Sequence, residues 1–170
     1  MIPPEVIAEL KSKNAKRIFV QFPEGLTLKI QEIAKELEKE GFEPVLCMNA
    51  VFGACDTRED ESRRLKCDTI LHIAHADFGI KPGMPIVYWD YLIDVDPLPI
   101  LEKNLNILDR FDNIGLITQL QYVKTLPIVQ KFLESKGRKV FIGKSKTEKY
   151  LGQVLGCRVD AGKMIDDKVD

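Results

Sequence analysis

Apolar residues recur along this chain in two alternating patterns. Short apolar runs bounded by turn residues predict strands, and apolar residues three or four positions apart predict amphipathic helices. The expected strands cover residues 17–21, 44–48, 69–74, 85–88, 114–118 and 139–142. The expected helices lie around residues 6–10, 26–37, 58–66, 100–108 and 128–133. Strand–helix alternation is typical of a parallel sheet covered by helices, so the pattern predicts the α/β class.

Helix ends are marked by specific residues in the same pattern. Gly41 and Gly137 follow the helical stretches 26–37 and 128–133, in the position where a helix ends with a left-handed residue. Thr125 precedes the second of these stretches and is expected to act as its N-cap.

The order of elements occurs twice. A strand, a helix, a glycine, a second strand and a cysteine-bearing loop occupy residues 17–55 and again residues 114–157. We therefore predict repeated parallel-sheet domains with flanking helices, over residues 1–108 and 109–170. The second repeat lacks counterparts of the third and fourth strands, so it is expected to be incomplete, with an exposed sheet edge. A shortened chain, a natural half-protein and a chain completed by a partner all fit this pattern.

Composition narrows the function classes. The 170 residues carry a net charge of −1, which does not suggest a generic nucleic-acid or membrane surface. No apolar stretch reaches the length of a membrane span, and the first residues do not resemble a signal peptide, so the cytoplasm is expected. The phosphate-binding glycine motifs, the serine-hydrolase elbow and the zinc-protease motif are all missing from the sequence.

Two of the four cysteines stand out by their neighbours. Cys55 lies in Gly53-Ala54-Cys55-Asp56, and Cys157 ends Gly152-Gln153-Val154-Leu155-Gly156-Cys157. Glycine has no Cβ, so the backbone of such loops can approach a bulky inorganic ligand. The two cysteines could converge on one cluster if two similar α/β units packed face to face. Cys47 and Cys67 are expected to be buried as small apolar residues.

Other polar groups follow the first and third strands. Pro23-Glu24-Gly25 lies between a strand and a helix, where a ligand carboxylate could meet a helix N-terminus, although a simple turn would have the same residues. His72 and His75 end the third strand and are expected to point to opposite faces. A zinc site built from Cys47, Cys55, Cys67 and a histidine is an alternative, but the spacings match no usual zinc pattern.

Four phrases together carry a family resemblance. They are Gln21-Phe22-Pro23-Glu24-Gly25-Leu26, Phe52-Gly53-Ala54-Cys55-Asp56, Cys67-Asp68 followed by Leu71-His72-Ile73-Ala74-His75, and Gly152–Cys157. In this order and at these distances, the chain resembles the archaeal enzymes that catalyse the first step of diphthamide biosynthesis. Ala74 stands where that family typically has glycine.

The resemblance implies a chemistry. It implies three similar α/β domains that each donate one cysteine to a central [4Fe–4S] cluster, with S-adenosylmethionine as the substrate bound at the open iron. A radical route would then transfer a 3-amino-3-carboxypropyl group to a histidine of translation elongation factor 2, in a homodimeric enzyme. Cys55 matches the first cluster ligand and Cys157 the second, and the third domain is absent from this chain.

The strand-end loops are the candidate contacts of S-adenosylmethionine. Their residues are Pro23, Glu24, Gly25, Gly53, Ala54, Asp56 and His75. No residue is assigned a catalytic role. Two alternatives stay open: a non-catalytic or split-subunit relative that supplies part of the cluster site, and a plain α/β binding module with inert cysteines. Neither a nucleic acid nor a membrane is expected as a partner.

Overall fold

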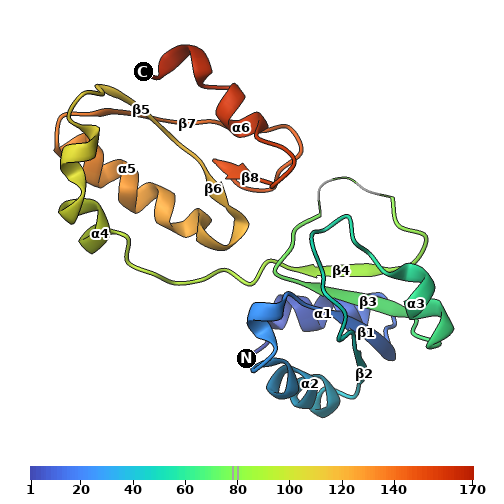
Figure 1. The fold of residues 1–170 in the computed structure, drawn as a ribbon. Helices are drawn as coiled ribbons and strands as arrows, with labels where there is room; N and C mark the ends of the chain where they lie inside the picture. The colour runs from blue at the N-terminus through green and yellow to red at the C-terminus, as the bar shows by residue number, and fades with distance from the viewer. Residues whose placement is uncertain (78, 80) are drawn as a thin grey trace. The chain divides into compact units, whose positions relative to one another are not determined.

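The computed structural model describes residues 1–77, 79 and 81–170. The chain forms two compact units, Met1–Tyr91 and Leu92–Asp170 (Figure 1). Both units combine parallel strands with helices, as the α/β prediction requires. Within the described ranges, no helix is long and apolar enough to cross a membrane.

The division between the units lies earlier than the predicted boundary after residue 108. Helix α4 (Leu98–Lys103) contacts helix α5 (Leu126–Ser135). The Ile93 N–H also donates a hydrogen bond of 2.8 Å to the Gln121 carbonyl. Residues 92–108 therefore belong with the second unit, although they precede the strand at which the pattern of elements restarts.

The first unit is built on a four-stranded parallel sheet. Its strands are β1 (Arg17–Gln21), β2 (Glu43–Leu46), β3 (Thr69–Ile73) and β4 (Ile86–Trp89), in the spatial order β2-β1-β3-β4. The helices are α1 (Pro4–Ser12), α2 (Ile30–Lys39) and α3 (Glu59–Arg64), with a 3-10 turn at Glu24–Leu26. Each expected strand occurs within two residues of its predicted ends.

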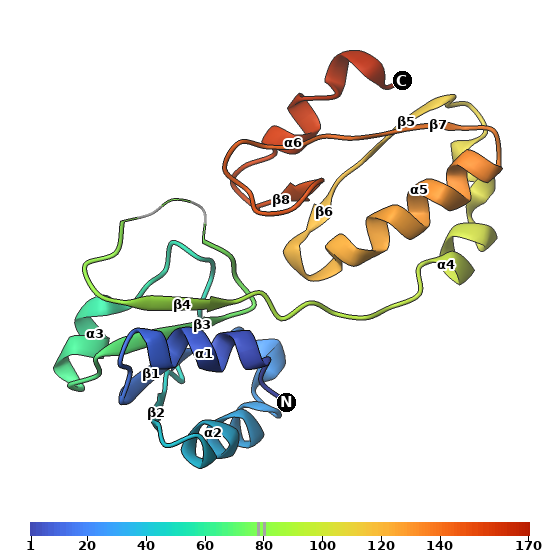
Figure 2. The same ribbon diagram turned by 180° about the vertical axis from the view of Figure 1, so that it is seen from behind.

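Side chains on the two faces of this sheet form separate apolar clusters. Ile18 and Val20 of β1 pack with residues of α1 and α2, such as Leu37. Phe19, between them, points to the other face and packs against Cys67 at the end of α3. Alternation along a strand explains this division, and it places α1 and α2 on one face and α3 on the other (Figures 1 and 2).

The second unit has two short parallel pairs of strands. β5 (Asn113–Leu116) pairs with β7 (Lys139–Ile142), and β6 (Thr118–Gln119) pairs with β8 (Gln153–Val154). Besides α4 and α5 it contains α6 (Asp160–Lys163) and 3-10 turns at Leu105–Leu108, Leu120–Thr125 and Asp166–Lys168. The predicted cap at Thr125 is wrong, because a 3-10 turn precedes α5 and the Thr125 hydroxyl donates to the Tyr122 carbonyl.

The two units share one spacing. Arg17 of β1 pairs with Glu43 of β2, and Asn113 of β5 pairs with Lys139 of β7, so both pairings join residues 26 positions apart. The helix between the paired strands has ten residues in each unit. Gly41 and Gly137 follow these helices with φ of +89° and +81°, in the left-handed region that glycine favours. The structure thus shows a repeated strand–helix–strand unit.

Candidate functional site

The first exposed cysteine lies in a tight turn between β2 and α3. The Asp56 N–H donates a hydrogen bond of 3.0 Å to the Gly53 carbonyl, which closes the turn around Ala54 and Cys55. Ala54 is buried, whereas Cys55 is exposed with a free thiol. A Cβ atom on Gly53 would lie 3.7 Å from the Cys55 sulfur, an ordinary van der Waals contact, so Gly53 directly borders the thiol.

A buried glutamine supports this turn from below. Gln21, the last residue of β1, is fully buried, and its Nε2 donates a hydrogen bond of 2.8 Å to the Asp56 carbonyl. Its Oε1 accepts a hydrogen bond of 3.2 Å from the Arg58 N–H. A buried polar side chain is stable only when it is hydrogen-bonded, and here both halves of the amide are used. Sequence reasoning assigned Gln21 no role, although a polar residue that ends an apolar strand is a usable signal.

Three polar side chains form a row across the carboxyl ends of the strands. The strand register places Gln21 beside His72 and His72 beside Tyr88. The His72 and Tyr88 rings lie 5.5 Å apart, centre to centre. Ligands of parallel α/β sheets bind at this edge, so the row lies where a substrate would be expected.

The two histidines contact each other, contrary to the prediction that they point to opposite faces. His72 Nε2 lies 3.0 Å from His75 Nδ1. The prediction was wrong because β3 ends at Ile73 and Ala74 has φ of +64°, which reverses the chain. Glycine adopts this conformation without strain, so Ala74 holds a backbone conformation that a glycine would adopt more easily.

The row is uncharged at neutral pH. Burial lowers the pKa of His72 to about 3, with a further contribution from His75 and a partial offset from the Gly53 backbone. Burial also lowers the pKa of His75 and raises that of Tyr88 to about 12. His72 Nδ1 is buried and has no hydrogen-bond partner among the described residues. These groups can therefore donate and accept hydrogen bonds without adding charge.

The loop after β1 differs from its prediction. Glu24 and Gly25 are exposed and Pro23 is partly buried, so the candidate residues are accessible. However, α2 begins only at Ile30, and a 3-10 turn uses the N–H groups of Leu26 and Thr27 for internal hydrogen bonds. The loop therefore does not lead directly into a helix N-terminus, and a ligand carboxylate would have to bind by other groups.

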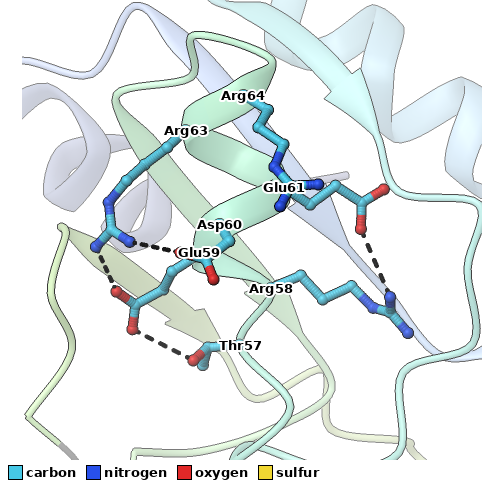
Figure 3. A pocket seen from close by; sticks show the side chains of 7 residues that line it. All are labelled: Thr57, Arg58, Glu59, Asp60, Glu61, Arg63 and Arg64. Carbon is cyan, nitrogen blue, oxygen red and sulfur yellow. Dashed lines mark hydrogen bonds and ion pairs between the residues drawn. The ribbon is translucent and has the colours of Figure 1, made fainter.

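Helix α3 borders a charged hollow of about 490 Å³ beside the Cys55 turn. Its lining residues, drawn in Figure 3, are Thr57, Arg58, Glu59, Asp60, Glu61, Arg63 and Arg64. Arg63 pairs with Glu59 at 2.8 Å and with Asp60 at 3.2 Å, so most of this charge is satisfied within the helix. Arg58 pairs with Glu61 at 3.5 Å and also donates to the Ala50 carbonyl at 2.9 Å, so it braces the loop before Cys55 (Figure 3).

The second exposed cysteine lies in a different kind of turn. Leu155 and Arg158 exchange backbone hydrogen bonds of 2.9 and 3.1 Å, which leaves Gly156 and Cys157 as a two-residue connection. Cys157 is exposed with a free thiol. The Arg158 guanidinium pairs with the buried Glu148 at 3.8 Å and with Asp160 at 3.3 Å. An ion pair therefore supports this turn, whereas a buried amide supports the first.

Two aspartates relate the positions of the two cysteines in the repeat. The Asp68 carboxylate accepts hydrogen bonds from the N–H groups of Lys16 and Arg17, at the start of β1. The Asp170 carboxylate accepts the same bonds from Asp112 and Asn113, at the start of β5. Cys55 precedes Asp68 by 13 positions, and Cys157 precedes Asp170 by 13 positions. The two cysteines therefore occupy corresponding places in the repeated units.

The other two cysteines are buried in the first unit, as predicted. Cys47 and Cys67 pack in the cluster around Phe19, and burial raises the pKa of both thiols. The part of the chain that the structure describes contains no group of three or more histidine, cysteine, aspartate or glutamate side chains able to hold a metal ion. The geometry of the described residues therefore gives the zinc alternative no support.

Comparison with known protein families identifies the family of this chain. Residues 22–170 match a family described as "Putative diphthamide synthesis protein". The chain belongs to the diphthamide synthesis family. It is 31% identical over 162 residues to a 2-(3-amino-3-carboxypropyl)histidine synthase of Pyrococcus horikoshii, covering 94% of this chain and 47% of that protein. Subunit 1 of the enzyme of this name in Nematostella vectensis is 30% identical, over 96% of this chain and 35% of the relative.

Solved structures of the family agree with the fold. Dph2 from Pyrococcus horikoshii superposes with a TM-score of 0.85 at 32% identity, over 95% of this chain and 49% of that one. A second structure of the same protein, with a 4Fe–4S cluster, gives a TM-score of 0.86 at 31% identity, over 96% of this chain and 49% of that one. The chain thus spans about half the length of Dph2.

Proposed function

We propose that this chain supplies two thiolate ligands, Cys55 and Cys157, to a [4Fe–4S] cluster of a diphthamide-synthesis enzyme. The observation that carries the proposal is the equivalence of the two cysteines, each exposed on a tight turn at the same place in a repeated unit. Thiolates are the usual ligands of such clusters. The solved structure of Dph2 with a 4Fe–4S cluster supports the choice of this cofactor.

The residues around each cysteine fit a bulky inorganic group. Gly53 begins the first turn and Gly156 lies within the second, and a Cβ atom on Gly156 would meet nothing within 4 Å. Two thiolates leave further iron positions for a third protein ligand and for a substrate, and the family resemblance implies that the third ligand lies outside these 170 residues. When bound, the cluster supplies one-electron chemistry. The turns hold the thiols, and Gln21 and Arg58 fix the first turn against the sheet.

The proposed substrate is S-adenosylmethionine, which would bind at the carboxyl edge of the first sheet. The candidates for contact are the residues of the strand-end loops, Pro23, Glu24, Gly25, Gly53, Ala54, Asp56 and His75, now joined by His72 and Tyr88. The uncharged His72–His75 pair would accept or donate hydrogen bonds there without attracting a counter-ion. The proposed acceptor of the 3-amino-3-carboxypropyl group is a histidine of translation elongation factor 2, in the cytoplasm and in a homodimeric enzyme.

Anaerobic reconstitution with iron and sulfide tests the assignment of the ligands. Iron and acid-labile sulfide would be measured in the chain, in Cys55→Ala and in Cys157→Ala. We expect both substitutions to lower the cluster content by at least about fivefold, because each removes one ligand. Cys47→Ala is the matched control, since Cys47 is a buried cysteine of the same unit and its loss should leave the cluster content unchanged.

Each alternative has its own outcome in this experiment. Cluster formation only after addition of a polypeptide that carries a third cysteine would favour the split-subunit relative. Equal iron and sulfide in all four proteins, or none in any form including the supplemented one, would leave a plain α/β binding module. Equal content in all four proteins and the absence of a cluster from every form would each overturn the proposed ligand set.

A further inference from the structure

A hydrogen bond joins the two histidines of the chain at the carboxyl edge of the first sheet. His72 Nε2 lies 3.0 Å from His75 Nδ1, and the ring centres are 4.8 Å apart. Burial lowers the pKa of both rings, so both are uncharged at neutral pH. An uncharged imidazole carries a proton on one ring nitrogen and a lone pair on the other. One ring must therefore donate to the other, which leaves two possible arrangements of the protons.

The surroundings of His72 favour one arrangement. His72 is fully buried, and its Nδ1 has no hydrogen-bond partner among the described residues. The Gly53 backbone nevertheless raises the pKa of His72, as a carbonyl oxygen near a ring N–H does. Because Nε2 faces His75, Nδ1 is the nitrogen left to carry a proton toward this carbonyl. His72 Nε2 then holds the lone pair.

This arrangement also places the proton of His75. Since His72 Nε2 accepts, His75 Nδ1 is the donor, and the lone pair of the uncharged ring lies on His75 Nε2. The Ile73 backbone raises the pKa of His75 as well, which agrees with a ring N–H on the nitrogen nearer to the main chain. His75 is only partly buried, and no hydrogen bond to its Nε2 occurs among the described residues. The pair thus presents a nitrogen with a free lone pair.

This nitrogen belongs to a ring beside the first cysteine turn. The Asp56 carboxylate, which follows Cys55 in the chain, is close enough to raise the pKa of His75. On the other side, the Tyr88 ring lies 5.5 Å from the His72 ring, centre to centre. A carboxylate beside an imidazole stabilises the cation that forms when the ring takes up a proton. The surroundings of His75 therefore suit a group that is uncharged at rest and accepts a proton during a reaction.

The transfer proposed above releases one proton. The 3-amino-3-carboxypropyl group would replace the hydrogen on a ring carbon of the acceptor histidine. In sum, the carbon–sulfur bond of the sulfonium breaks and leaves a neutral thioether, a carbon–carbon bond forms, and the ring C–H bond breaks. The overall change consumes no oxidant or reductant, and the former ring hydrogen leaves as a proton. A base with a free lone pair is needed to take this proton.

Resting on the proposed function, we propose that His75 Nε2 is the general base that takes this proton, and that His72 is the positioning residue that keeps the lone pair on that nitrogen. His75 would contact the acceptor ring, whereas His72 acts only through His75. This division of roles follows their burial, because His72 is fully enclosed and His75 is partly exposed.

Nitrogen NMR on the chain without iron tests the arrangement of the protons. The chain has only two histidines, so the chemical shifts of four ring nitrogens show which are protonated. We expect both rings in the Nδ1–H form at neutral pH, with His75 Nε2 unprotonated. His72→Phe removes the acceptor of the His75 Nδ1–H, so the Nε2–H form of His75 should become populated. His72→Gln is the matched control, since its amide oxygen can still accept this bond.

Separate measurement of the two halves of the reaction tests the base. Thioether release reports cleavage of S-adenosylmethionine, and modified elongation factor 2 reports transfer. Both would be measured in whichever form holds a cluster in the reconstitution experiment. We expect His75→Ala to lower transfer by about 100-fold or more and to change thioether release by less than about threefold. Added imidazole should restore part of the transfer, because it supplies a free base in the space that the side chain leaves.

The outcomes separate this proposal from the one on which it rests. A proton on His75 Nε2 in the chain without iron would overturn the base and leave the cluster ligands unaffected. Unchanged transfer in His75→Ala would do the same, as would equal losses of thioether release and transfer that imidazole does not restore. Absence of both a cluster and thioether release from every form would instead overturn the proposed function, and the base with it.

Discussion

At the scale of single residues, a buried amide decides the conformation of the first cysteine turn. Gln21 bonds the Asp56 carbonyl and the Arg58 N–H. Among the described residues, neither group has another hydrogen-bond partner. Removal of one partner of a buried hydrogen bond leaves the other group desolvated without compensation. The position of Cys55 therefore depends on a side chain that lies on a strand 34 positions earlier.

Gln21→Leu should destabilise the first unit and loosen this turn. We expect the free energy of unfolding to fall by about 1–3 kcal/mol, because two buried backbone groups lose their partner. Exchange of the Asp56 amide should become at least about tenfold faster. Gln130→Leu is the control, since the Gln130 side chain makes an exposed hydrogen bond to Glu134 within α5, and its loss should cost less than about 0.5 kcal/mol. Equal effects of both substitutions would contradict this role of Gln21.

His72 should make the folded state sensitive to mild acid. Its pKa is about 3 in the folded chain against 6.5 for a free histidine. Below pH 6.5 the unfolded chain therefore binds a proton that the folded chain does not, so stability falls as the pH falls. Between pH 7.5 and 5.5 the loss from His72 is about 1.4 kcal/mol, and His75 adds to it in the same direction.

Urea unfolding at these two pH values would measure this loss. His72→Gln keeps a polar side chain but cannot titrate, so its free energy of unfolding should change less between pH 7.5 and 5.5, by about 1 kcal/mol. The chain has only two histidines, which keeps other contributions in this range small. An identical pH dependence in both proteins would show that His72 has the same pKa in the folded and unfolded chains, which contradicts this prediction.

At the scale of elements, the sequence predicts most of the fold and only part of the site. The strands of the first unit and the long helices have clear apolar periodicity, and Gly41 and Gly137 mark helix ends. β8 and α6 were not predicted, because elements of two and four residues have no period to detect. The contact between His72 and His75 also could not be predicted, since it depends on the positive φ of Ala74.

Close packing of α6 against the end of β7 predicts a sharp difference between two glycines. A Cβ atom on Gly143 would lie 1.7 Å from the Ala161 carbonyl oxygen, whereas one on Gly156 would meet nothing within 4 Å. Gly143→Ala should therefore cost about 3 kcal/mol through overpacking, and Gly156→Ala less than about 0.5 kcal/mol. Chemical unfolding followed by far-UV circular dichroism would compare them. A similarly small loss of stability in both variants would mean that α6 can shift away from the end of β7 at little cost.

At the scale of the whole molecule, the two units differ in how completely their apolar side chains and strands are buried. Among the described residues, both large clusters of buried apolar side chains belong to the first unit. In the second unit, β5 is only partly covered and Ile117 is 44% exposed. Burial of apolar surface is the main favourable contribution to folding, so the second unit should be the less stable one.

Unfolding in urea should therefore occur in two steps. The single tryptophan, Trp89, is buried in the first unit, so its fluorescence reports that unit alone. Far-UV circular dichroism reports the helices of both units. We expect the dichroism signal to begin its change at a lower urea concentration than the fluorescence. Coincident transitions would show that the two units unfold as one cooperative body.

The shared spacing of the two units also has a consequence for how this chain can change over generations. Because the chain contains the same scaffold twice, its two units can be compared with each other, and each unit indicates which substitutions the other could tolerate. Both copies have a cysteine at the corresponding place, yet one turn is supported by the Gln21 amide and the other by the Arg158 ion pair. One scaffold thus carries an exposed thiol with either kind of support, so each support is a candidate replacement for the other.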